Sequence, residues 1–139
     1  MCGIAGRIVT GGGQLGRNLV ELMEAQEHRG ADSTGFAVYG PMRDTGYVLR
    51  GMGFDKRKID SDLVDFEHIL RDHASDFISE PTVTTDNNAH YCFRMEIKDP
   101  KDIDAWVQDA DTLTDRIEVQ SCGRSLEIIK DIGGAAAVA

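Results

Sequence analysis

Apolar residues recur along the chain with two different periods, which predict both helices and strands. Over residues 14–28 and again over residues 59–73 they return every three or four positions, so each stretch is expected to form an amphipathic helix. Gly30 follows the first stretch, as is usual after a helix end, and Asp60 or Ser61 can cap the second. A third, shorter helix is expected over residues 100–110.

Short apolar runs between these stretches predict strands. Residues 3–9 (GIAGRIV) are small and branched and are expected to form a buried strand. Residues 82–97 predict one strand or a bent pair. Two hairpins are also expected, one joining 36–39 with 47–50 and the other joining 117–121 with 126–129. Short strands alternating with helices predict an α+β or mixed α/β domain.

The length and composition fit one soluble domain. The chain has 139 residues, of which 41% are hydrophobic and 28% are charged. No apolar run is long enough to cross a bilayer, and no basic region followed by an apolar stretch opens the chain as a secretory signal would. We therefore expect a cytoplasmic protein. Residues 133–139 are small and featureless, and are expected to be a linker, a tail or the place where a longer chain was cut.

The net charge and the cysteine content limit which ligands and which cross-links the chain is expected to have. A formal net charge of -9 disfavours nucleic acids and anionic membrane surfaces, so neither is expected to bind. The three cysteines are widely spaced, which argues against a disulfide framework. His90 and Cys92 would share one face of a strand, but two ligands do not make a zinc site. We interpret them as ordinary strand residues and predict no metal and no cofactor.

Cys2 has a chemical consequence if Met1 is removed. Its thiol and the new α-amino group would then belong to one residue. An α-amino group has a pKa of about 7.7–8.0, so it can take the thiol proton directly or through one water. A thiol starts from a pKa near 8.5 and needs little help. The ordinary alternative is a small residue close to a frayed chain end.

A second polar cluster follows the first predicted helix. Arg29, Asp32 and Ser33 lie between Gly30 and Gly35, which permit a tight backbone path. An arginine there can hold a carboxylate through two parallel hydrogen bonds. The alternative is a helix end and an Asx-turn, in which these side chains only satisfy the local backbone.

These two motifs together resemble the class II glutamine amidotransferases. The resemblance rests on M-C-G-I-A-G at residues 1–6, a following amphipathic helix, R-G-A-D-S-T-G at residues 29–35 and the strand F-A-V-Y after it. It covers about the first third of the chain. The ending S-C-G-R-S-L-E-I-I-K-D-I-G is similar to that of one subgroup, the amidotransferase subunits of N-methylglutamate synthase and archaeal-type glutamate synthase.

The resemblance implies an N-terminal nucleophile hydrolase fold, in which two antiparallel sheets are layered between helices. It implies that Cys2 attacks the side-chain amide of L-glutamine and forms a thioester. Arg29 and Asp32 match the segment that lies beside the nucleophile and shapes its pocket. The implied partner is a synthase subunit or domain that receives the ammonia, within a hetero-oligomer.

Two segments of the family do not occur in this chain. One is the H-T-R-like segment whose arginine grips the glutamine carboxylate, and the other is the Asn-Gly pair that binds the oxyanion. We therefore expect residues 1–139 to be the N-terminal part of an amidotransferase domain, with residues 54–121 as a candidate insertion. Either the chain is a fragment, or another chain completes the site, or the protein is a non-catalytic interaction module.

Overall fold

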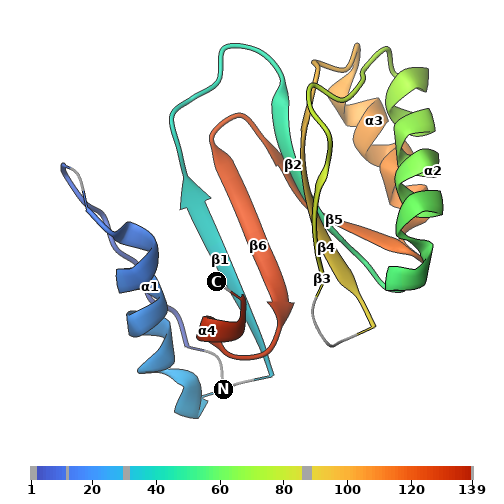
Figure 1. Ribbon diagram of the computed structural model, residues 1–139. Coiled ribbons are helices and arrows are strands. Elements are labelled where there is room, and N and C mark those ends of the chain that lie inside the picture. The colour runs from blue at the N-terminus through green and yellow to red at the C-terminus, as the bar shows by residue number, and fades with distance from the viewer. Residues whose placement is uncertain (1–2, 12, 30–31, 86–88, 139) are drawn as a thin grey trace. The chain divides into compact units, whose positions relative to one another are not determined.

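The computed structural model describes residues 3–11, 13–29, 32–85 and 89–138, with Arg29 described by its backbone alone. The chain divides into two compact units (Figure 1). We call residues 38–128 the central unit, and residues 1–37 together with 129–139 the terminal unit. The strands β1 (Ser33–Tyr39) and β6 (Leu126–Ile132) run from one unit into the other.

The central unit is built on a four-stranded antiparallel sheet in the order β3-β4-β2-β5. Its strands are β2 (Tyr47–Gly53), β3 (Thr82–Thr85), β4 (Tyr91–Ile97) and β5 (Ile117–Gly123). The helices α2 (Ile59–Asp72) and α3 (Ile103–Ala110) lie together on one face of this sheet (Figure 1). Short 3-10 turns precede α2 at Lys56–Lys58 and follow α3 at Asp111–Leu113.

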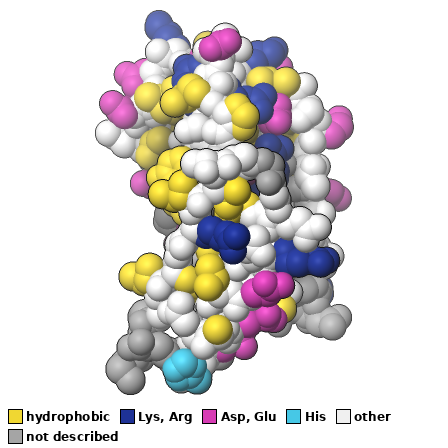
Figure 2. Space-filling view, turned by 90° about the vertical axis from the view of Figure 1, so that its left-hand side faces the viewer, with side chains coloured by type: hydrophobic (Ala, Val, Ile, Leu, Met, Phe, Trp, Pro, Cys, Tyr) yellow, Lys and Arg dark blue, Asp and Glu magenta, His cyan; other side chains and the backbone are white. Residues whose placement is uncertain are grey.

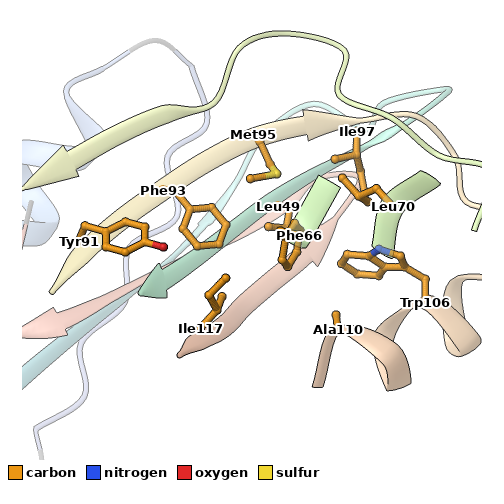
Figure 3. Packing of buried hydrophobic residues seen from close by; sticks show 10 residues of the cluster. All are labelled: Leu49, Phe66, Leu70, Tyr91, Phe93, Met95, Ile97, Trp106, Ala110 and Ile117. Carbon is orange, nitrogen blue, oxygen red and sulfur yellow. The ribbon is translucent and has the colours of Figure 1, made fainter. Parts of the chain in front are cut away.

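Alternation along β4 explains why one face of the sheet carries the core. Every second residue of β4 is buried, and these side chains meet the buried faces of α2 and α3 (Figure 3). Phe66 of α2 contacts the rings of Phe93 and Trp106 edge to face, with centroids 5.9 and 6.0 Å apart. The core cluster comprises Leu49, Phe66, Leu70, Tyr91, Phe93, Met95, Ile97, Trp106, Ala110 and Ile117.

The terminal unit holds the two ends of the chain. It contains the helix α1 (Leu15–Glu24), the 3-10 turn η1 (Glu27–Arg29) and the short helix α4 (Ala135–Val138). β1 and β6 form a two-stranded sheet. The amide of Gly133 donates to the carbonyl of Asp32, and the amide of Gly40 donates to that of Ser125, so the start of β1 lies at the end of β6 and the pair is antiparallel.

The predicted helices are confirmed, and so is the bent pair of strands. α1, α2 and α3 lie within the stretches expected at residues 14–28, 59–73 and 100–110. Residues 82–97 form the antiparallel neighbours β3 and β4. The central unit covers residues 38–128 and so extends beyond the candidate insertion at 54–121. It includes β2, which supplies Leu49 to the core.

The buried strand predicted at residues 3–9 is wrong. These residues pair with no strand that the structure describes, and Ile4 and Ile8 are 92% and 95% exposed. Figure 2 shows hydrophobic side chains on the face of the molecule that it draws. A strand must satisfy its amides and carbonyls on a neighbouring strand, so an apolar run without such a neighbour keeps an irregular path.

Both predicted hairpins are also wrong. β1 pairs with β6, and β2 pairs with β4 and β5. Ion pairs distant in the sequence stabilise this arrangement, because Glu127 at the start of β6 accepts hydrogen bonds from Arg50 of β2 and Arg94 of β4 at 2.6 and 3.0 Å. Sequence-adjacent runs therefore join different sheets.

Candidate functional site

The structure describes part of the predicted site, but not the predicted nucleophile. Cys2 lies outside the described residues. Arg29 is the last residue of η1, and its side chain lies outside the description too. Asp32 is exposed and immediately precedes β1. The backbone of the predicted R-G-A-D-S segment therefore links the end of α1 to the start of β1.

Gly3, which follows Cys2 in the sequence, lies against the residue that precedes η1. A Cβ built on Gly3 would be 2.8 Å from Oε1 of Gln26 and 3.1 Å from its Cβ. A side chain at position 3 would therefore require Gln26 to shift, and the nearest atom is the end of that flexible side chain. The structure thus places Gly3 beside the residue that precedes the turn Glu27–Arg29.

Three hydrogen bonds join this turn and the start of β1 to residues 133–135. The amide of Ala135 donates to Oε1 of Glu27 at 2.9 Å. The hydroxyl of Thr34, which is 7% exposed, donates to the carbonyl of Gly133 at 2.8 Å, and the amide of Gly133 donates to the carbonyl of Asp32 at 3.2 Å. Glu27, Asp32 and Thr34 are thereby each bonded to the backbone of residues 133–135.

The sequence-based interpretation missed the role of residues 133–139. The sequence predicts a linker, a tail or the place where a longer chain was cut, whereas in the structure Ala135 begins α4 and is 1% exposed. A Cβ built on Gly134 would overlap Oε1 of Glu27, so a larger residue there would require the Glu27 side chain to move. The only signal in the sequence is the Gly-Gly pair itself, which does not identify its partner.

The two other thiols of the sequence, Cys92 and Cys122, lie in the central unit. Burial raises the pKa of Cys122, on β5, to about 12, so it is protonated at neutral pH. Cys92 is half-buried on β4, two residues after His90, which is 8% exposed. Among the described residues no group of three or more His, Cys, Asp or Glu side chains could hold a metal ion.

A buried polar network lies at the opposite end of the central core from Trp106 and is structural in character. Asp62 is 1% exposed and accepts hydrogen bonds from the hydroxyl of Tyr91 at 3.1 Å and from Arg116 at 2.9 Å. Burial, and then the charge of Asp62, raise the pKa of Tyr91 far above its usual value. Its phenol therefore stays protonated and donates to the carboxylate.

Comparison with known proteins gives one informative relative. The chain is 29% identical over its whole length to a protein of Methanothermobacter thermautotrophicus described as a "Putative glutamine amidotransferase". The chain spans 46% of the length of that protein. This similarity supports a relationship to glutamine amidotransferases. No protein-family profile matches the chain, and no solved structure matches it. Within the described part of the chain, no helix is long and apolar enough to cross a membrane.

Proposed function

We propose that the chain is the N-terminal part of a class II glutamine amidotransferase and that Cys2 is its nucleophile. The supporting observation is the similarity of all 139 residues to an amidotransferase-like relative, together with the approach of Gly3 to the turn that carries Arg29. The proposal includes the N-terminal nucleophile hydrolase fold, a cytoplasmic location and a synthase partner that receives ammonia.

The proposed reaction is hydrolysis of the glutamine side-chain amide. The α-amino group of Cys2 takes the thiol proton, and the thiolate adds to the amide carbonyl carbon. The carbon–nitrogen bond then breaks, and the nitrogen leaves as ammonia after it has taken up that proton. A γ-glutamyl thioester remains. Water adds to it, the carbon–sulfur bond breaks, and glutamate and the free thiol are released.

Arg29 and Asp32 are proposed to shape the glutamine site. A guanidinium can hold a carboxylate bidentately, and a carboxylate can accept from an ammonium group. The carbonyl of Asp32 accepts the amide of Gly133, and Glu27, two residues before Arg29, accepts the amide of Ala135. The family segments that hold the glutamine carboxylate and the oxyanion do not occur in these 139 residues. An oxyanion donor lowers the barrier by roughly 3–4 kcal/mol, so the proposed reaction needs such a donor from elsewhere.

A non-catalytic amidotransferase-like module is the second candidate. It is favoured by the absence of an H-T-R-like segment and of an Asn-Gly pair from these 139 residues. Such a module would keep the fold and bind a synthase partner without hydrolysing glutamine.

Three measurements test the proposed function. Intact mass should show a protein without Met1, because a retained methionine blocks the amine and excludes the mechanism. A glutamine-mimicking alkylator, such as a chloroketone of the same shape, should modify Cys2 and spare Cys92 and Cys122. Ammonia release from glutamine should vanish in Cys2→Ala. A protein that binds a synthase but releases no ammonia, even in that complex, would establish the second candidate instead.

A further inference from the structure

A row of polar side chains crosses the face of the central sheet that lies opposite α2 and α3. Arg50 and Arg94 are direct partners in the register of β2 and β4, and each follows a core residue, so both side chains project from that opposite face. Thr82 of β3 is the partner of Arg94, and Ser121 of β5 is the partner of Arg50. The row therefore carries two guanidinium groups between two hydroxyl groups.

Arginines outnumber carboxylates in the ion pairs of this face. Oε2 of Glu127 accepts hydrogen bonds from Nε of Arg50 at 2.6 Å and from Nε of Arg94 at 3.0 Å. Glu96 accepts two from Arg43, at 3.1 and 2.6 Å. Three guanidinium groups thus share two carboxylates, although the whole sequence has 24 acidic and 15 basic residues. This cluster therefore has one surplus positive charge in an acidic protein.

The guanidinium of Arg50 keeps donors for a further acceptor. Its Nε bonds to Glu127, whereas none of the described residues accepts a hydrogen bond from its two Nη groups. The side chain is 26% exposed, so a solute can reach it while water solvates its charge only in part. The two Nη groups of an arginine match two oxygens of one anionic group. The hydroxyl of Ser121 accepts the amide of Ile128 and can still donate its own hydrogen.

We infer that Arg50, Arg94 and Ser121 form a binding site for the carboxylate group of a small molecule. A carboxylate balances the one surplus charge, whereas a phosphate group would bring a further negative charge close to Glu127. Like charges directly opposite each other on neighbouring strands are unfavourable, so a second anion beside Arg50 and Arg94 also relieves their repulsion. The site lies within the central unit and does not depend on the proposed function.

Titration of the 139-residue chain with acetate tests this site. The arginine Nε–H resonances of nitrogen-15-labelled protein report on each guanidinium, and Arg50→Lys identifies the signal of Arg50. We expect this signal to shift and saturate over millimolar acetate at constant ionic strength, but not over sodium chloride. Arg57 is exposed and bonds to Asp55, so its signal is the reference and should not move. A shift without saturation, or an equal shift of Arg57, would overturn the inference.

Two substitutions change the charge of the cluster in opposite directions. Arg50→Gln should weaken acetate binding, followed at Arg94, by at least about tenfold, because charge-assisted hydrogen bonds are lost. Arg57→Gln is the matched control and should leave binding unchanged. Glu127→Gln keeps an acceptor oxygen but removes one negative charge, so acetate should bind about threefold or more tightly. This variant also tests the site if Arg50→Gln does not fold, and weaker binding to it would contradict the inference.

Phosphate distinguishes the two classes of anion. At the same pH and ionic strength it should shift the signal of Arg50 less than acetate does, because it carries more than one negative charge at neutral pH. Tighter binding of phosphate than of acetate would overturn the assignment to a carboxylate. None of these titrations uses glutamine, so the outcome is separate from any measurement of glutaminase activity.

Discussion

Replacement of Gly53 by alanine is expected to destabilise the central unit strongly. Gly53 is buried on β2, directly opposite Tyr91 of β4 in the antiparallel register. A Cβ built there would overlap ring atoms of Tyr91, which is fully buried. The ring cannot swing aside freely, because its hydroxyl donates to the buried carboxylate of Asp62 at 3.1 Å.

The expected size of the effect follows from three contributions. Alanine restricts the unfolded chain more than glycine does, which favours folding by about 0.4–1 kcal/mol. An added methyl group in a well-packed core costs about 1–3 kcal/mol. If the ring of Tyr91 moves, Asp62 loses a hydrogen-bond donor, and this costs about 1–3 kcal/mol more. The net destabilisation of Gly53→Ala is then about 3 kcal/mol, or on the order of 10 °C in Tm for a domain of this size.

Urea unfolding followed by tryptophan fluorescence measures this loss in the central unit. Trp106 is the only tryptophan in the sequence and is fully buried in the central core. Gly16→Ala is the control, since a Cβ on Gly16 of α1 meets nothing within 4 Å and should be neutral or stabilising. In a Tyr91→Leu background, Gly53→Ala should cost less than about 1 kcal/mol. A Gly53→Ala protein as stable as the original would refute the packing described for Tyr91.

Three further predictions concern the central unit. Asp62→Ala should cost about 1–3 kcal/mol in urea unfolding, because it leaves the buried hydroxyl of Tyr91 without its acceptor, whereas Arg116 keeps Asp65; a loss below about 0.5 kcal/mol would contradict this. Burial raises the pKa of Glu127, but hydrogen bonds from Arg94 and a second arginine outweigh it and lower the pKa below 4.5. A lowered pKa in the folded state contributes to the free energy of unfolding fully above pH 4.5, and this contribution is lost as the pH falls. Glu127→Gln should therefore make the free energy of unfolding fall less steeply with acid. An unchanged slope would exclude the ion pair. Cys122, whose pKa burial raises to about 12, should react with iodoacetamide at pH 8 at least about a hundredfold more slowly in the native protein than in urea, as peptide mass spectrometry would show; equal rates would place it at the surface.

Local periodicity was sufficient to predict the elements of the central unit. The helical spacing over residues 59–73 and the alternation over residues 91–97 come from side chains that pack into the same core. Each pattern can therefore be read from its own stretch of sequence. Strand pairing is different, because it depends on contacts between distant residues. Glu127 bonds to arginines 33 and 77 positions away, and nothing in the neighbouring sequence identifies those partners.

In the candidate site, too, residues in local motifs could be predicted and contacts between distant residues could not. Cys2, Arg29 and Asp32 are predicted because each lies in a short motif of adjacent residues. The approach of Gly3 to Gln26 is compatible with that prediction. The groups that hold this segment were not predicted, since Glu27 and Ala135 are 108 residues apart. A glutamate beside a helix end and a Gly-Gly pair near residue 134 are both ordinary locally. Their structural role follows from the contact between Glu27 and Ala135, which the sequence alone does not predict.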